Sequence, residues 1–298
     1  MNTYIEGISN AGVPGFSSVI STMPALSQRD RVVYNVMLEE GAKFILSARD
    51  GGAVAALYPG KPLWLYVKSD YENSYKNNYK NNYDFRIFFA DCMQYLSKAY
   101  EFNSRESNGH EFNGNELSGH EFSGLIASSW AAEIFKEVCP MPVVRSWEMA
   151  SLYLDKPINY KYKSKLVIPN IKDLAMISIW IKEFYREALS SDIKNEEKIA
   201  RVLIGKKQLY CLEAEGIGLT AMAMSIPVAE MGRLNLIYTP PSLRGRGYAR
   251  EITASIATLV QNSGKLPVLY ARLENKAAIE LYKSLGFLEA GRLVELKF

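Results

Sequence analysis

The chain has 298 residues, of which 48% are hydrophobic and 22% are charged, as in globular proteins with enough apolar mass for two cores. The balance of 35 Lys and Arg against 32 Asp and Glu gives a net charge of +3, which does not indicate a nucleic-acid partner. The three cysteines are far apart and form no C-x-x-C pair, so neither a disulfide framework nor a zinc site is indicated, and a reducing cytoplasm fits.

Histidine is scarce. The two histidines, His110 and His120, lie ten residues apart in a repetitive polar stretch, where solvation is the simpler interpretation than metal binding. A Ser-His-Asp triad, a Cys-His pair and a multi-histidine metal site are therefore not expected. Catalysis, if present, must use other groups, and we expect no metal.

The N-terminal region contains the longest uncharged stretch, residues 7–28. It is rich in serine and broken by Pro14, Gly15 and Pro24, and no basic segment of the kind found in signal peptides precedes it. We therefore expect residues 1–27 to form an irregular extension, with no membrane span and a cytoplasmic location.

Short apolar runs and helical periodicity define a first domain over residues 28–160. Strands are predicted at 43–48, 53–58, 62–68 and within 142–154, the first two as a hairpin around Asp50-Gly51-Gly52. Helices are predicted at 28–40, 84–100 and 129–138. The best candidate linker to the second half is 156–163, which contains Pro157.

Two tracts of low complexity interrupt this first domain. Tyrosines recur every four residues from Tyr71 to Tyr83; they could form a helical stripe, but the intervening asparagines favour a solvated loop. Residues 100–124 repeat every five residues and resemble a pentapeptide-repeat tract. Five copies cannot stack a second full turn of such a solenoid, so we favour an expanded surface loop.

The second half predicts a clear order of elements: strand, two helices, three strands, helix, strand, helix and strand. The predicted strands lie at 166–168, 208–214, 219–226, 233–239 and 267–272 and run on to residue 298. The predicted helices start after Asn170, include residues 199–203, and cover 247–262 and 275–284.

A glycine-rich turn, S-L-R-G-R-G-Y-A, connects the predicted strand at 233–239 to a helix. Such a turn leaves helix N-terminal N–H groups unpaired, and the helix dipole adds positive potential, so the pattern predicts an anion cradle suited to a pyrophosphate. Gly245 and Gly247 allow close approach of the backbone, and Arg244 and Arg246 add charge. The spacing is neither the dinucleotide fingerprint nor a Walker loop.

Residues 244–249, R-G-R-G-Y-A, match the R/Q-x-x-G-x-G/A signature of the GCN5-related N-acetyltransferases (the GNAT superfamily). Residues 275–287, N-K-A-A-I-E-L-Y-K-S-L-G-F, resemble the second cofactor segment of that family, and the order of elements after residue 165 resembles its fold. The loop, after I-P-N-I-K-D-L and W-I-K-E-F-Y-R-E-A, is most similar to a bacterial group of two-domain predicted acetyltransferases whose first half is a degenerate copy.

This resemblance implies an α/β (α+β) fold of tandem GNAT-like domains, each a mixed, mostly antiparallel central sheet flanked by helices. The domain over 28–160, with its insert at 100–124, is then the degenerate copy, and 161–298 is the domain that binds acetyl-CoA. The Tyr/Asn tract takes the place of the pyrophosphate loop in the first half. We therefore expect the first half not to bind CoA and to have a structural or substrate-shaping role.

The resemblance also assigns cofactor contacts. The pyrophosphate loop consists of Arg244, Gly245, Arg246, Gly247, Tyr248 and Ala249. The backbone of Ile237, Tyr238 and Thr239 is expected to pair with the pantetheine arm and to give an N–H to the thioester oxygen, although the same residues also fit a simple core strand. Asn275 aligns with a cofactor-contacting asparagine; a helix cap would explain it equally.

Two residues are candidates for the chemistry. Tyr282 aligns with the tyrosine that often protonates the departing CoA thiolate, and the alternative is a tyrosine that only packs in the core. Glu230, just before the strand at 233–239, is a candidate general base, and the alternatives are a solvated turn residue and a water chain that carries the proton.

The predicted activity is transfer of an acetyl group from acetyl-CoA to a primary amine of a small molecule or peptide, by direct attack in a ternary complex. No nucleic acid or membrane is expected as a partner. The alternative is a CoA-binding sensor or interaction protein that kept the fold and lost turnover. The sequence leaves the acceptor, the acyl length and the oligomeric state open.

Overall fold

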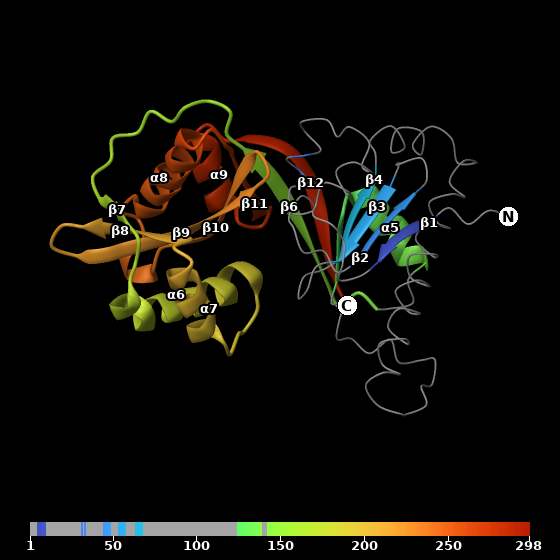
Figure 1. Cartoon of the computed structure of the whole chain (residues 1–298), viewed down its shortest axis with the longest axis horizontal. Coiled ribbons are helices and arrows are strands. Elements are labelled where there is room, and N and C mark those ends of the chain that lie inside the picture. Colours follow the sequence, from blue (N-terminus) through green and yellow to red (C-terminus); the bar gives the residue numbers. More distant parts are fainter. Residues whose placement is uncertain are drawn as a thin grey trace. The chain divides into compact units, whose positions relative to one another are not determined.

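The structure is a computed structural model of the whole chain (Figure 1). It describes residues 5–9, 31, 33, 44–48, 53–57, 63–67, 124–138 and 142–298. Arg31 and Val33 are helical, as predicted for 28–40, while the rest of that helix, the Tyr/Asn tract, the helix at 84–100 and the repeats at 100–123 lie outside the described residues. The chain divides into two compact units, Met1–Met149 with Arg292–Phe298, and Ala150–Gly291.

The first unit contains the predicted hairpin and third strand. Its strands are β1 (Ile5–Ser9), β2 (Phe44–Ala48), β3 (Ala53–Leu57), β4 (Leu63–Val67) and β5 (Gly124–Ala127), joined by part of β12 (Leu288–Lys297). They follow the order β1-β2-β3-β4-β5-β12, and all these neighbours pair antiparallel except β4 and β5, which are parallel. Helix α5 (Ser129–Val138) was predicted with the same bounds.

Two short strands of this unit were not predicted. The expectation of an irregular extension over 1–27 is wrong for β1, which pairs antiparallel with all five residues of β2. The segment I-E-G-I-S has no alternating pattern, and β2 supplies the backbone partners that hold it in the sheet. Strand β5 has four residues, all buried, and it begins at Gly124, which the sequence assigned to the insert.

The second unit contains every element predicted after residue 165. Its strands are the rest of β12, β6 (Arg145–Tyr153, which also extends into the first unit), β7 (Lys165–Val167), β8 (Leu209–Ala214), β9 (Gly218–Val228), β10 (Met231–Tyr238) and β11 (Leu266–Arg272). Its α-helices are α6 (Leu174–Leu189), α7 (Glu196–Gly205), α8 (Tyr248–Asn262) and α9 (Lys276–Ser284). The strand order is β12-β6-β11-β10-β9-β8-β7, so the predicted mixed α/β fold with a mostly antiparallel sheet is confirmed.

The two units share one pairing pattern. In the first, β2, β3 and β4 pair antiparallel and β4 is then parallel to β5. In the second, β8, β9 and β10 pair antiparallel and β10 is then parallel to β11. The same succession of three antiparallel strands and one parallel strand therefore occurs in both units. The chain passes from the first unit to the second between residues 149 and 150, whereas the domain boundary was expected at 160–161.

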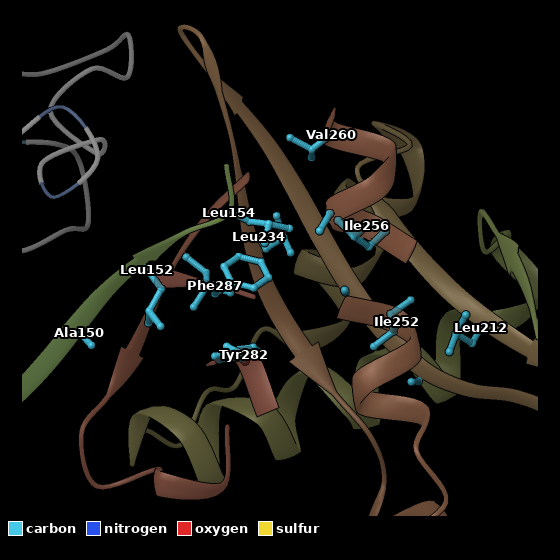
Figure 2. Close-up of a cluster of buried hydrophobic side chains, with 14 residues drawn as sticks. Ala150, Leu152, Leu154, Leu212, Leu234, Ile252, Ile256, Val260, Tyr282 and Phe287 are labelled. Atoms are coloured by element: carbon cyan, nitrogen blue, oxygen red, sulfur yellow. The ribbon is translucent and has the colours of Figure 1, made fainter. Parts of the chain in front are cut away.

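The core of the second unit lies on both faces of its sheet. One cluster combines Leu234 of β10 with Ile252 and Ile256 of α8 and with Tyr282 and Phe287 at α9 (Figure 2). The other places Ile177, Trp180 and Ile181 of α6 against Leu236 and Tyr238 of β10. Side chains of β10 therefore reach both clusters, and this strand connects the two layers of helices.

Gly232 allows β10 to approach α8 closely. A Cβ at this position would lie 2.5 Å from Val260 Cγ1 and 2.6 Å from Cγ2. We expect Gly232→Ala to lower the free energy of unfolding by about 1–3 kcal/mol, as overpacking does in well-filled cores. Urea unfolding of the single variant and of Gly232→Ala with Val260→Ala tests the cause. If the second change restores no stability, the clash with Val260 is not responsible.

Candidate active site

Strand β10 carries a bulge near its C-terminal end. Its register with β9 is regular up to the Asn235–Met224 pair and then shifts, so that Tyr238 lies opposite Met222. Within the bulge Leu236 has a φ of 50°, which is uncommon for a residue other than glycine. The Leu236 N–H donates to Asn235 Oδ1 at 2.8 Å. One extra residue on β10 thus redirects the backbone just before the loop.

The parallel ladder between β10 and β11 ends early. Paired residues run from Met231–Leu266 to Arg233–Val268, and within 231–238 and 266–272 no later pair is formed. Each strand nevertheless continues for several residues. The ends of the two strands are therefore not joined to each other by a ladder.

The glycine-rich loop follows directly. A 3-10 turn, Pro241–Leu243, leads to two glycines in the left-handed region, with φ of 76° at Gly245 and 87° at Gly247. No heavy atom lies within 4 Å of a Cβ built at either position, so both open onto free space. Helix α8 starts at Tyr248, and its first i to i−4 bond runs from the Glu251 N–H to the Gly247 carbonyl. The N–H groups before it are those expected to hold an anion.

The side chain of Arg244 is bound to protein groups. Its Nε donates to the Thr239 carbonyl at 3.0 Å, and its Nη2 donates to Glu187 Oε2 of α6 at 2.6 Å. The guanidinium carbon lies 5.7 Å from the centre of the Tyr238 ring. The motif predicts that Arg244 adds positive charge to the anion cradle, and it gives no indication of Glu187. The only local signal for Glu187 is its place on the helix W-I-K-E-F-Y-R-E-A.

The residues at the end of β10 differ in exposure. Ile237 is half-buried and packs on the cluster of α8 and α9. Tyr238 is buried on the opposite face, 6.4 Å from Trp180 between ring centroids, and burial followed by the charge of Glu187 raises its pKa. Thr239 is 7% exposed, and its buried Oγ1 has no hydrogen-bond partner within the described part of the chain.

Asn275 caps helix α9. Its Oδ1 accepts a hydrogen bond from the Ala278 N–H at 3.2 Å, and the residue is exposed. The capping interpretation is therefore confirmed. Contact with a cofactor stays a prediction, because a capping oxygen leaves the amide Nδ2 as a donor.

Tyr282 lies in the core of the second unit. It is 8% exposed, and its ring centroid lies 6.0 Å from that of Phe287. Burial raises the pKa of its hydroxyl to about 12, so the phenol keeps its proton at neutral pH. The same cluster includes Ile237 of β10 and Tyr248 of α8 at its margin. Three predicted site residues from three elements therefore converge on one cluster.

Glu230 is not brought to this site. It is exposed in the turn before β10, and its carbonyl accepts the Leu266 N–H at the start of β11. At about 3.3 Å per residue, β10 separates Glu230 from Thr239 by roughly 30 Å. The choice of Glu230 followed its nearness in sequence to β10, and it overlooked that a strand places its two ends far apart.

Segment 156–164 runs along α8, from the C-terminal end of the helix to its first turn. Gln261 Nε2 donates to the Lys156 carbonyl at 2.9 Å, and the Tyr162 hydroxyl bonds Thr258 Oγ1 at 2.8 Å. Near the first turn, the N–H groups of Lys163 and Ser164 both donate to Glu251 Oε1 at 2.6 Å. Glu251 is 3% exposed, so its buried side chain fixes α8 to the segment predicted as a linker.

Removing that carboxylate should destabilise the chain. We expect Glu251→Ala to lower the free energy of unfolding by about 1–3 kcal/mol, because two partly buried N–H groups lose a charged acceptor. Glu251→Gln keeps an Oε1 and should lose less. Urea unfolding of both variants measures the difference in the free energy of unfolding. Equal losses of stability in the two variants would show that hydrogen bonds to Oε1 do not stabilise the chain.

The described residues contain neither a metal cluster nor a membrane-spanning helix. No group of three or more His, Cys, Asp or Glu side chains in them could hold a metal ion. No helix among them is both long and apolar enough to cross a membrane.

Comparison with known proteins identifies the fold. Residues 214–294 match the family model of FR47-like protein, while no curated protein matches the chain. A GNAT-family acetyltransferase from Colwellia psychrerythraea superposes with a TM-score of 0.55 at 13% identity, over 99% of this chain and 100% of that one. The chain has a GNAT fold.

Two further GNAT structures agree. A GCN5-related N-acetyltransferase from Sphaerobacter thermophilus has a TM-score of 0.52 at 13% identity, covering 86% of this chain and 79% of its own. A GCN5-related N-acetyltransferase-like protein from Streptococcus suis 89/1591 has a TM-score of 0.50 at 12% identity, covering 95% and 97%. The GNAT resemblance drawn from the loop and from residues 275–287 is thus confirmed at the level of the fold.

Proposed function

We propose that the chain transfers an acetyl group from acetyl-CoA to a primary amine. The observation that carries this proposal is the bulged strand β10, which separates from β11 and runs into the open loop at the N-terminus of α8. One arrangement thereby offers strand edges for an amide-bearing arm and helix N–H groups for an anion. Acetyl-CoA is a substrate with both features.

The loop supplies the anion site. The N–H groups around Gly245, Gly247 and the first turn of α8 would hold the pyrophosphate, and the exposed Arg246 would add charge. The pantetheine arm would pair with the backbone of Ile237–Thr239 at the end of β10. Asn275, exposed at the start of α9, would contribute its amide nitrogen.

The reaction is a direct displacement. The neutral amine nitrogen attacks the thioester carbon, and a backbone N–H at the end of β10 stabilises the negative charge that develops on the thioester oxygen. Collapse of this intermediate breaks the C–S bond. The Tyr282 hydroxyl then gives its proton to the sulfur, and the extra proton of the new amide passes through water back to the Tyr282 phenolate.

The raised pKa of Tyr282 is compatible with this role. Burial that raises the pKa of the phenol to about 12 also disfavours the thiolate, since both anions lose hydration in the same place. The two groups therefore stay closer in basicity than the phenol value alone implies. With Glu230 remote, a water chain is the simpler route for the amine proton.

Calorimetry and thiol release test the proposal. Acetyl-CoA should bind once per chain, and CoA thiol should appear with some member of a panel of polyamines, amino acids, aminoglycosides and short peptides. Two equivalent sites would contradict the expectation that only the second half binds. Binding without thiol release for every amine would favour the alternative of a CoA-binding sensor or interaction protein.

A further inference from the structure

Arg244 makes three contacts with groups of the protein, and a residue that only binds an anion would not need them. The Thr239 carbonyl, the Glu187 carboxylate and the face of the Tyr238 ring all engage its guanidinium. A planar guanidinium can satisfy such a set at once, because its donors point in fixed and different directions. Its charge is already compensated by a carboxylate at 2.6 Å.

The contacts join the two ends of the loop to α6. Thr239 is the first residue after β10, and Arg244 immediately precedes Gly245, so the Nε bond closes a turn across the segment between them. Glu187 lies in the last turn of α6 and fixes that closed turn from outside. At the same helix end, Arg272 of β11 donates to the Leu189 carbonyl at 3.5 Å.

We propose that Arg244 is a positioning residue of the loop, and that Glu187 is the partner through which it acts. Arg244 holds the backbone after β10 in the conformation that presents the N–H groups of the cradle, and Arg246 is left as the loop's charge for the anion. This inference rests on the proposed function, since the cradle is read as the site of acetyl-CoA. It adds a helix residue outside the glycine motif to the determinants of CoA affinity.

Two pairs of variants separate positioning from direct charge. Arg244→Lys keeps the positive charge but cannot reach the carbonyl and the carboxylate together. If Arg244 positions the loop, Arg244→Lys and Arg244→Ala should each weaken CoA binding about tenfold, the effect of losing one charge-assisted bond. If it binds the anion as a charge, Arg244→Lys should bind almost as the wild type.

The second pair lies on α6. Glu187→Ala should also weaken CoA binding about tenfold, and the double variant with Arg244→Ala should lose no more than either single variant, because both act through one contact. Glu183→Ala is the matched control. Glu183 stands one turn earlier on the same helix and pairs with Arg186, so CoA affinity should not change.

Salt dependence gives an independent measurement. CoA affinity should fall less steeply with ionic strength in Arg246→Ala, which removes a charge from the loop. In Arg244→Lys and Glu183→Ala the slope should stay that of the wild type. Thermal unfolding of each variant reports whether the chain remains folded.

The outcomes are distinct. Wild-type binding with full affinity retained in Glu187→Ala, or an additive loss in the double variant, would overturn the positioning role and leave the proposed function standing. Absence of CoA binding by the wild-type chain would overturn both.

Discussion

Gly247→Asp is expected to weaken acetyl-CoA binding by at least about 100-fold. The new carboxylate would stand at the mouth of α8, where the N–H groups and the helix dipole favour an anion. Two like charges about 4 Å apart repel each other by about 4 kcal/mol at an effective dielectric of 20. This energy is larger than the one that corresponds to a loss of affinity of about 100-fold. Isothermal calorimetry with CoA measures the effect.

Gly264→Asp provides the matched control. Gly264 follows the other end of the same helix, with a φ of 73°, and no heavy atom lies within 4 Å of a Cβ built there. Both variants therefore carry a similar backbone strain and an exposed new charge, but only one lies at the loop. If Gly247→Asp and Gly264→Asp bind CoA with equal affinity, the pyrophosphate does not bind at the N-terminus of α8.

The loop could be predicted because its determinants are local. Two glycines, the spacing of the motif and the apolar period of α8 all lie within a few residues of one another, and each has a physical meaning without its partners. The order of elements after residue 165 was predictable for the same reason. Apolar runs and turn residues there follow one another without interruption.

Other features of the site depend on pairing and could not be predicted. Nothing in R-L-N-L-I-Y-T marks Leu236 for a φ of 50°, since the bulge is defined only against β9. The early end of the ladder with β11 is likewise a property of two strands. The Arg244–Glu187 pair joins residues 57 positions apart, and single charges in a sequence do not reveal their partners.

Strand β5 of the first unit could not be predicted from the sequence for the same reason. Strand β5 has four residues, and its pairing with β4 lies across a long stretch of sequence. A short apolar run of this kind fits a buried strand or a helix segment equally well. Its identity as a strand follows only from its neighbours β4 and β12, between which it pairs.

Tyr282→Phe is expected to lower turnover by roughly 10²-fold, within the usual range for one general acid. The change keeps the ring that packs 6.0 Å from Phe287 between centroids and removes only the hydroxyl. Acetyl-CoA affinity should change little, so the loss should appear in kcat rather than in KM. Release of CoA thiol with an accepting amine, measured for both proteins, gives the ratio.

The pH profile adds a second readout for this residue. Because burial raises the pKa of Tyr282 to about 12, the hydroxyl keeps its proton throughout the usual assay range. Wild-type activity should therefore rise with pH as the acceptor amine loses its proton, with no alkaline fall from Tyr282 below about pH 10. The raised pKa of Tyr282 also affects the free energy of unfolding. Burial of the neutral phenol stabilises the folded state fully below the ordinary pKa near 10, and this stabilisation is lost as the pH rises toward 12.

Tyr210→Phe separates chemistry from packing. Tyr210 of β8 is half-buried at the margin of the same core cluster, so its substitution removes a similar hydroxyl from a strand that β9 separates from β10. We expect this control to retain wild-type turnover, with a change in stability no larger than that of Tyr282→Phe. Full turnover in Tyr282→Phe itself would exclude the phenol as the acid, and the thiolate would then take its proton from water or from the attacking amine.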